Sequence, residues 1–503
     1  MNWMPSLAAR FLFDTIPAMS PTAYDAVIVG SGPNGLAAGI TLAGQGLRVL
    51  IREAAALPGG GMRTAELTLP GFLHDICSAV HPMAGLSPFL RTLPLRDFGL
   101  EWEHPEILLS HPLGGGRAAA FARDFSKTTD LLGPEDGGRW RRLFEPFVAG
   151  AAGLYGDLLG PFPWLPRHPF LLGRFGLSAL WPATGLAASR FRGEEARALF
   201  CGNAAHGFLP LDKPLTAAVG MALSLAGHAA GWPVARGGSV AITRAMMGYF
   251  ESLGGVVECG APVRDVRELP SARAVLFDTG PHATAAIARA WLPAAYVERL
   301  TRFRYGPGVF KMDYALSGPV PWLDPHSRLA GTVHLGGTME EMAASESEIC
   351  QGRTPSRPFI LVGQQSLCDP TRAPAGQQTL WAYAHVPAGS GVDFSENITS
   401  RIEEYAPGFR DLILASHAMS PEAVARYNMN NVGGDVIGGV MDWKQLFTRP
   451  VPRLNPYTMP HPALFHCSSS TPPGAGVHGM CGYHAARTAL RKVFGIRLPL
   501  AGE

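Results

Sequence analysis

The chain has 503 residues, of which 47% are hydrophobic and 16% are charged, and its formal net charge is only +2. This length exceeds what one ordinary hydrophobic core organises, so we expect two or three lobes around a shared interface. The near-neutral charge argues against nucleic acid as a partner and favours no acidic partner either.

The seven cysteines are widely scattered and include no Cys-x-x-Cys pair. Zinc sites and redox dithiols normally require such close pairs, so we predict neither a metal site nor a redox disulfide. The thiols are expected to be reduced, which indicates a cytoplasmic protein.

Residues 1–23 are apolar in character but lack the basic segment and continuous apolar run of a secretory signal. We expect an N-terminal arm there. Elsewhere no charge-free apolar run reaches the ~20 residues of a membrane-spanning helix. The sequence therefore predicts a protein that is either soluble or peripheral to a membrane.

The first ordered motif is a strand, a glycine turn, a helix and a second strand between residues 25 and 53. Gly30 allows the tight turn, Gly32 lets the backbone approach a pyrophosphate, and Gly35 lets the helix pack against the strand. The helix N-terminus, with its free amides and positive dipole, then faces the phosphates. The turn consists of Gly30, Ser31, Gly32, Pro33, Asn34 and Gly35. This order of elements predicts a dinucleotide-binding βαβ unit.

Glu53 stands at the end of the second strand of this unit. A carboxylate there accepts hydrogen bonds from free ribose hydroxyls and repels the 2′-phosphate of NADP. The motif alone therefore leaves FAD and NAD as candidate ligands.

The rest of the chain changes character several times. Residues 126–230 are apolar and helical in pattern with proline interruptions, residues 235–266 return to strands and a helix, and strand-like runs follow residue 300. We expect Pro262 to Val266 to form a strand. The predicted fold class is α/β, with a discontinuous Rossmann-type cofactor-binding domain and a mixed sheet-plus-helix substrate domain. The expected boundaries are an arm at 1–23, cofactor-binding parts at 24–110, 231–300 and 456–503, a helical substrate subdomain at 111–230 and a substrate-domain sheet at 301–455.

Six segments of the chain together resemble the phytoene desaturase-related family of FAD-dependent oxidoreductases, within the monoamine-oxidase-like flavoprotein group. The likeness runs from Tyr24 through nearly the whole chain and is nearest to the subgroup called pyridine nucleotide-disulfide oxidoreductase domain-containing protein 2. The segments are YDAVIVGSGPNGLAAGITLAGQG, LPGGGMRTAEL, the Gly237-Gly238 block, RYGPGVFKMDYALSGPVPW, YNMNNVGGDVIGG and SSSTPPGAGVHGMCGYHAA.

The resemblance implies FAD as the cofactor and assigns residues to it. The glycine turn would lie at the pyrophosphate, Glu53 at the adenosine ribose, and Val263 at the adenine, with Asp278 in a loop nearby. Two further groups would approach the flavin, namely Gly60, Gly61, Met62 and Arg63, and then Gly476, Val477 and His478. The chain departs from the family pattern at Pro472 and Ala475, where many relatives carry histidine and glycine, so the local geometry of that contact stays open.

Two side chains are candidates for catalysis. His478 would lie beside the flavin, where an imidazole could tune its N1/O2 edge, and the alternative is a helix-capping histidine. Lys311 lies in the strand-like run GVFKMDYAL and could hold a water near flavin N5, as a lysine does in amine oxidases. The alternative is a strand lysine that faces solvent.

Three other groups have both a functional and a structural interpretation. His74, Asp75 and His81 either line the cavity or pair with one another. The asparagines of YNMNNVGGDVIGG either shape the substrate cavity or serve a loop. The aromatic residues of the helical insertion either form a lipid-facing route for an apolar substrate or pack internally, and they are Trp164, Phe170, Phe175 and Trp181.

No second GxGxxG follows a strand, so a disulfide reductase with a nicotinamide domain is not expected. We predict an enzyme that removes a hydride and a proton from an apolar or amine-bearing small molecule, with O2 or a quinone as electron acceptor. The alternatives are a flavin-containing binding or assembly protein, a non-redox isomerase and an NAD-linked dehydrogenase. Peripheral membrane contact and a homodimer stay open.

Overall fold

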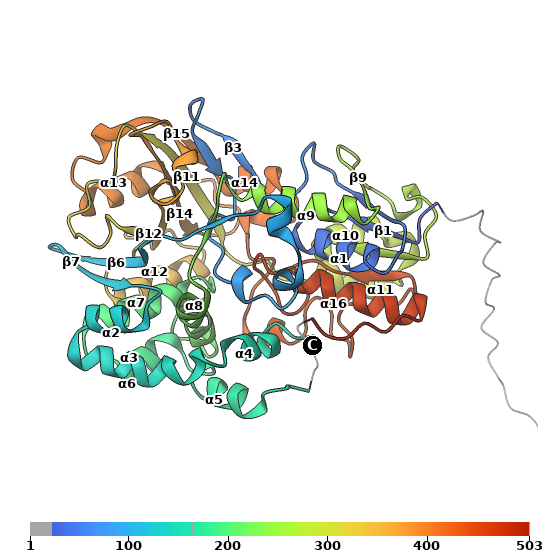
Figure 1. The fold of residues 1–503 in the computed structure, drawn as a ribbon, viewed down its shortest axis with the longest axis horizontal. Helices are drawn as coiled ribbons and strands as arrows, with labels where there is room; N and C mark the ends of the chain where they lie inside the picture. Colours follow the sequence, from blue (N-terminus) through green and yellow to red (C-terminus); the bar gives the residue numbers. More distant parts are fainter. Residues whose placement is uncertain (1–22, 162–164, 502–503) are drawn as a thin grey trace, which may run out of the picture.

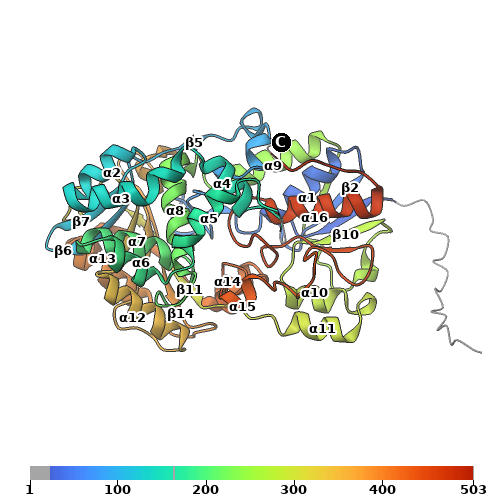
Figure 2. The ribbon, with the colours of Figure 1, turned by 90° about the horizontal axis from the view of Figure 1, so that it is seen from below.

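A computed structural model describes residues 23–161 and 165–501. Two lobes lie side by side, and each is built around its own sheet (Figures 1 and 2). The described part of the chain leaves out residues 1–22, 162–164 and 502–503. The predicted N-terminal arm, apart from its last residue, and Trp164 therefore lie outside it.

The first lobe contains a five-stranded parallel sheet with the order β16-β10-β1-β2-β9. Alternate residues of β1 face opposite sides, as the period of a strand requires. Ala26 and Ile28 belong to the core that includes α1, α9 and α16, whereas Val29 belongs to the core under α10 and α11. The strands are β1 (Ala26–Val29), β2 (Val49–Arg52), β9 (Val256–Glu258), β10 (Ala274–Phe277) and β16 (Leu464–His466). The helices are α1 (Pro33–Ala43), α9 (Val240–Ser252), α10 (Pro281–Ile287), α11 (Ala294–Thr301) and α16 (Met480–Ala489).

The second lobe contains a seven-stranded mixed sheet with the order β15-β11-β14-β13-β12-β6-β7. One face carries apolar residues such as Phe310, Met312 and Ala382, which pack with Ile398 and Ile402 of α13. The strands are β6 (Ile107–Gly114), β7 (Arg117–Phe121), β11 (Gly308–Leu316), β12 (Ala330–Leu335), β13 (Ile360–Gly363), β14 (Gln378–Val386) and β15 (Ile413–Met419). The nearby helices are α12 (Met339–Cys350), α13 (Ser395–Tyr405), α14 (Pro421–Tyr427) and α15 (Trp443–Leu446).

A layer of helices lies beneath the second sheet in Figure 1. Its central helix α8 packs against α3, α5, α6 and α7, and their buried side chains join the same core as α1 and α16. The helices are α2 (Phe125–Leu131), α3 (Gly133–Val148), α4 (Ala151–Leu158), α5 (Pro169–Ala179), α6 (Ala183–Arg190), α7 (Glu194–Ala205) and α8 (Thr216–Ala230). Two short ribbons complete the fold, formed by β3 (Thr64–Glu66) with β4 (Leu73–Asp75), and by β5 (Trp102–Glu103) with β8 (Val234–Ala235).

The predicted fold class is confirmed, because the structure combines a Rossmann-like parallel sheet with a mixed second sheet. The parallel sheet takes its strands from three separated stretches of the chain. One local prediction is wrong, since Pro262 to Val266 forms no strand. Pro262 has no backbone donor for a ladder, and Gly260 turns the chain with φ +64°.

Candidate cofactor site

A cavity of about 810 Å³ lies at the edge of the first lobe. It begins at the glycine turn after β1 and extends to the loop before α16. This volume lies within the range typical of cofactor and ligand pockets, and such pockets form at the carboxyl ends of parallel strands. The walls come from residues 29–34, 52–55, 60–63, 77–78, 80–83, 262–264, 278–279, 283, 286–287, 426–431, 436, 438, 469 and 475–477, together with Leu223 of α8.

The glycine turn has the geometry that its motif predicts. Gly30 has φ +104°, a conformation that L side chains rarely adopt. A Cβ on Gly35 would lie 2.1 Å from the Gly30 carbonyl oxygen, so only glycine allows α1 to start this close to β1. Pro33 occupies the first turn of α1, where its fixed φ is compatible with the helix, and Asn34 follows it in the cavity wall.

Glu53 lies at the end of β2 and is buried with 7% of its surface exposed. Its Oε2 accepts hydrogen bonds from the Ser31 backbone N–H at 2.9 Å and from the Ser31 hydroxyl at 2.6 Å. Its Oε1 accepts from the Ala55 backbone N–H at 2.9 Å and from Arg63 Nη2 at 3.4 Å. The carboxylate is therefore fixed at the cavity wall beside the glycine turn.

Asp278 follows β10 and is buried against the start of α1. Its Oδ2 accepts a hydrogen bond from the Gly35 backbone N–H at 2.9 Å, and its carbonyl oxygen accepts from Asn430 Nδ2 at 3.0 Å. Burial, with a smaller contribution from the nearby Glu53 carboxylate, raises the pKa of Asp278 to about 8. The carboxyl group is therefore mostly neutral at pH 7.

Arginines outnumber carboxylates in the cavity wall. Arg63 lies deepest, where its Nε donates to the Pro58 carbonyl oxygen at 3.2 Å and its guanidinium lies 5.2 Å from the centre of the Tyr427 ring. The other arginines are Arg52, Arg264 and Arg426. Arg52 pairs with Glu258 and Arg426 with Glu422 outside the wall, so the excess of positive charge available to a diphosphate is small.

The far end of the cavity is formed by the loop before α16 and by residues 80–83. Gly476 and Val477 line it, as do Gly60, Gly61 and Met62 from the opposite side. Val263 lines the end near β9. All the predicted cofactor residues except Gly35 and His478 therefore line one continuous cavity.

His478 is completely buried behind Gly476 and is not part of the cavity wall. Its Nδ1 accepts a hydrogen bond from the backbone N–H of Met480, the first residue of α16, at 3.0 Å. Burial lowers the pKa of His478 to about 4, so the ring is neutral at pH 7. This geometry agrees with the helix-capping alternative.

Lys311 is buried in β11, with 3% of its surface exposed, so the alternative of a solvent-facing lysine is wrong. Its ammonium forms an ion pair with Asp313, and His74 Nδ1 lies 3.6 Å from Asp313 Oδ1. Lys311 acts electrostatically on Cys77, which lines the cavity. The lysine therefore lies one residue behind the wall rather than in it.

His74, Asp75 and His81 are predicted either to line the cavity or to pair with one another, and the structure shows one side chain that lines the cavity and another that forms an ion pair. Asp75 accepts from Arg372 Nη1 at 2.9 Å in a buried ion pair, whereas His81 lines the cavity. Burial lowers the pKa of His81 to about 4, so that imidazole is neutral as well.

The asparagine segment lies at the glycine turn rather than at a separate substrate cavity. Asn430 Oδ1 accepts from the Gly280 backbone N–H at 2.8 Å, and Asn428 and Asn431 also line the wall. The sequence interpretation missed several wall residues that adjoin recognised motifs: Arg52 before Glu53, Cys77 before His81, and Arg426, Tyr427 and Met429 around Asn428. Their proximity to those motifs is the signal that could have identified them.

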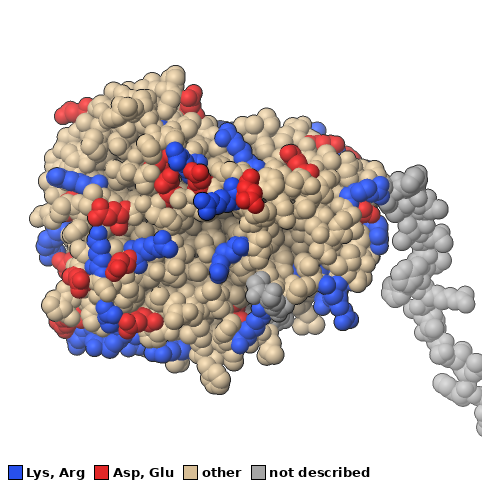
Figure 3. All heavy atoms as spheres, in the orientation of Figure 1, with Lys and Arg blue, Asp and Glu red and all other residues tan. Residues whose placement is uncertain are grey.

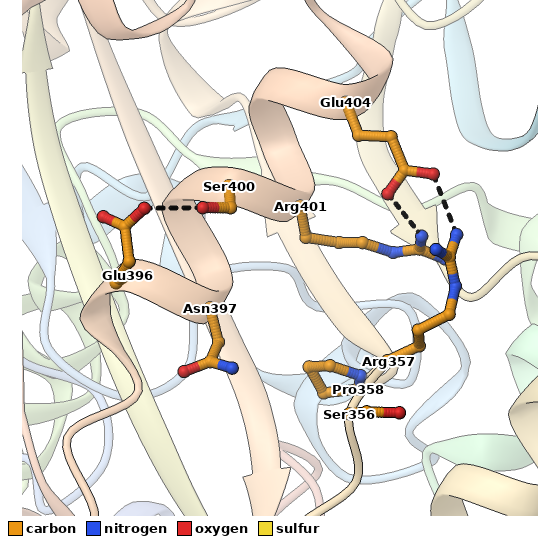
Figure 4. Close-up of a pocket in the computed structure, with 8 residues that line it drawn as sticks. All are labelled: Ser356, Arg357, Pro358, Glu396, Asn397, Ser400, Arg401 and Glu404. Carbon is orange, nitrogen blue, oxygen red and sulfur yellow. Dashed lines mark hydrogen bonds and ion pairs between the residues drawn. The ribbon is translucent and has the colours of Figure 1, made fainter.

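A smaller cavity of about 220 Å³ opens between α13 and the chain before β13. Figure 4 shows Glu404 between two guanidinium groups there, with 2.8 Å to Arg357 Nη2 and 2.7 Å to Arg401 Nη1. None of the predicted site residues lines it. Its exposed ion pairs satisfy one another, so the larger cavity is the candidate site.

Metal-binding clusters and membrane-spanning helices are both absent from residues 23–161 and 165–501. No cluster of three or more His, Cys, Asp or Glu side chains in these ranges could hold a metal ion. No helix in the same ranges is both long and apolar enough to cross a bilayer.

Known proteins resemble this chain both in sequence and in fold. Residues 28–92 match the NAD(P)-binding Rossmann-like domain family. Pyridine nucleotide-disulfide oxidoreductase domain-containing protein 2 of Mus musculus is 27% identical over 93% of both chains. The lycopene-forming phytoene desaturase of Pseudescherichia vulneris is 24% identical over 92% of this chain and 98% of its own. Putrescine oxidase bound to putrescine shares the fold, with a TM-score of 0.58 and 18% identity over 94% of this chain and 98% of its own.

The two alignments cover nearly the whole of this chain and of each relative. One relative is named an oxidoreductase domain-containing protein and the other a phytoene desaturase. The solved structure independently shows the same fold. The chain is therefore related over nearly its whole length to an oxidoreductase domain-containing protein and to phytoene desaturases, and it contains a Rossmann-like domain at residues 28–92.

Proposed function

We propose that this chain binds FAD in the 810 Å³ cavity and oxidises an apolar or amine-bearing small molecule by removing a hydride and a proton. The observation that carries the proposal is the continuity of the cavity. It joins the glycine turn after β1 to the Gly476-Val477 loop before α16, and stretches from the start, the middle and the end of the chain supply its walls.

The residues present fit the parts of FAD. The Glu53 carboxylate is positioned to accept hydrogen bonds from the adenosine ribose, and the bare backbone of Gly30 and Gly32 leaves room for the pyrophosphate. Arg63 supplies positive charge on the same path, and Val263 offers its main chain to the adenine. Gly476 and Val477 would then lie beside the flavin ring.

When bound, FAD supplies a two-electron acceptor to which a substrate can transfer a hydride. The chain's own contribution is positioning and exclusion of water. Val80, Met83 and Leu223 give the far end of the cavity apolar walls. Burial raises the pKa of the Cys77 thiol to about 11, so this group is protonated at pH 7 and is not a nucleophile.

The substrate class is inferred from these apolar walls and from the named relatives, which include phytoene desaturases and putrescine oxidase. The acceptor is inferred from the sequence, which has no second GxGxxG motif after a strand for a nicotinamide. We therefore propose O2 or a quinone as the group that reoxidises the enzyme.

The test is the absorption spectrum of freshly purified protein, followed by anaerobic reduction and then exposure to air. Flavin bands that bleach on reduction and return in air are expected. Titration of stripped protein with FAD and, separately, with NAD+ distinguishes the two ligands. A protein that binds NAD+ but not FAD would refute the proposal, and one whose bound flavin cannot be reduced would favour a binding protein.

A further inference from the structure

The outer face of α5 and the chain just before and just after it carry an exposed apolar surface. Five large side chains form this surface, which we call the α5 face, and their exposed fractions are far above those of core residues. They are Leu165 (92%), Phe170 (93%), Leu177 (75%), Leu180 (60%) and Trp181 (46%).

The spacing shows that the α5 face is one continuous stripe. Phe170, Gly173, Arg174 and Leu177 are exposed positions at helical intervals, and Leu180 and Trp181 continue the same side beyond the helix end. The opposite side of α5 is also occupied, since Phe175 is buried against Phe147 of α3. A surface helix of a soluble protein normally presents polar residues outward, so an apolar outward face indicates a partner surface.

The stretch of chain that contains the α5 face carries charge of one sign, and Arg167 and Arg174 are the arginines next to or within α5. Residues 158–193 contain no aspartate or glutamate, whereas four arginines occur there, at positions 167, 174, 190 and 192. All four are exposed. In Figure 3 the lowest part of the molecule, where α5 lies in Figure 1, is largely uncharged, and both basic and acidic side chains lie to its left. An apolar face bordered by cations is complementary to a membrane surface with anionic headgroups.

We propose that the α5 face docks this protein on an anionic lipid bilayer. Phe170, Leu177 and Leu180 enter the outer part of the acyl region, and the arginines keep their guanidinium groups at the phosphates. Trp181 lies at the helix end, where an aromatic ring suits the boundary between headgroups and acyl chains. This contact lies on the surface of the bilayer and needs no membrane-spanning helix.

The α5 face also lies close to the candidate cofactor cavity in the fold. Helix α5 packs against α8, and α8 contributes Leu223 to the cavity wall. A membrane-dissolved apolar substrate would therefore approach the enzyme on its helical side. This consequence rests on the proposed function, whereas docking itself does not.

The experiment is co-sedimentation of the full-length protein with vesicles of phosphatidylcholine alone or mixed with phosphatidylglycerol. Each arginine near an anionic surface contributes about 1 kcal/mol, or roughly fivefold in affinity, so binding should be at least tenfold tighter to mixed vesicles and should weaken with salt. The double variant Phe170→Glu/Leu177→Glu is expected to lose about tenfold or more of this binding. Leu414→Glu is the control, because Leu414 is 45% exposed and lies on β15 of the second sheet, outside the α5 face.

A second readout reports on the contact itself. Brominated lipids should quench part of the tryptophan fluorescence, and Trp181→Phe should remove that part. Equal vesicle binding by wild type and the double variant would refute the proposal, as would failure of the wild type to bind mixed vesicles. A concentration-dependent dimer that only the double variant abolishes would instead assign the α5 face to a second copy of the chain. Bound flavin is measured separately by absorbance, so failure of lipid docking leaves the proposed function standing.

Discussion

Single residues at the glycine turn explain how a chain of low charge could hold a dianionic ligand. The Glu53 carboxylate is preorganised by hydrogen bonds from Ser31 and Ala55, so it needs no rearrangement to meet a ribose. Asp278 lies on the other side of the turn but holds its proton at pH 7 because it is buried. The two carboxyl groups therefore play different electrostatic parts at one site.

Replacing Glu53 tests the first of these parts. Glu53→Gln removes a charge-assisted acceptor, which contributes about 1.5–3 kcal/mol, so the dissociation constant for FAD should rise about tenfold to 100-fold. The measurement is quenching of flavin fluorescence on titration with stripped protein. Glu298→Gln in α11 is the control, because Glu298 pairs with Arg302 at the surface, outside the cavity wall, and its loss should change affinity less than twofold. Equal losses in both variants would contradict the ribose assignment.

Titration of Asp278 tests the electrostatic role of the second carboxyl group. Because burial raises its pKa to about 8, the carboxyl is neutral below pH 8 and becomes an anion above it, close to the expected pyrophosphate. FAD affinity should therefore fall between pH 7 and pH 9, by at most about tenfold per pH unit. Asp278→Asn should bind FAD with no such decline in this interval. A decline of the same size in the variant would show that another group is responsible.

At the scale of elements, a buried ion cluster connects the two lobes. Arg372, which follows β13, donates to Asp75 of β4 at 2.9 Å and to Asp369 at 2.6 Å, and Asp369 accepts from the Gly237 backbone N–H at 2.8 Å. The cluster holds the loop before α9 against β4. It also fixes the chain that leads from Asp75 to His81 in the cavity wall.

Removal of the central cation should therefore destabilise the fold. Arg372→Met leaves two buried carboxylates without their partner, and we expect the free energy of unfolding to fall by about 3–5 kcal/mol. Arg117→Met is the control, since Arg117 pairs with Glu194 at the surface and its side chain is 56% exposed. That loss should stay within about 1 kcal/mol. Urea denaturation of both variants measures the difference, and similar midpoints would argue against the cluster's importance.

The elements also show what could be predicted from the sequence. The unit β1, α1 and β2 follows from local signals, namely glycine spacing and apolar periodicity, and β11 has the bounds of its apolar run. The burial of Arg372 could not be predicted, because its partner Asp75 is 297 positions away. The Asn430 contact with Asp278 likewise depends on tertiary structure. The exposure of Phe170 and Trp181 could not be predicted from the sequence either, because it also depends on tertiary structure. Phe175 is buried, as the alternative of internal packing predicts.

At the scale of the whole molecule, the cavity is the place where chain segments that are far apart in sequence meet. Residues 29–34, Leu223 of α8 and residues 475–477 all face it. A ligand in this position binds the native arrangement and not the unfolded chain, so it stabilises every segment that forms the wall. FAD should therefore act as a structural link between the parallel sheet and the helical layer.

This link predicts that FAD raises the stability of the entire chain. At a free concentration 100 times the dissociation constant, binding adds about 2.7 kcal/mol to the free energy of unfolding. Differential scanning fluorimetry of stripped protein should show one transition that moves upward with FAD and is unchanged by NAD+. In Glu53→Gln the same FAD concentration should give a smaller shift, because the affinity is lower. A shift confined to one of two separate transitions would show that the cavity belongs to a single lobe and does not couple the rest of the chain.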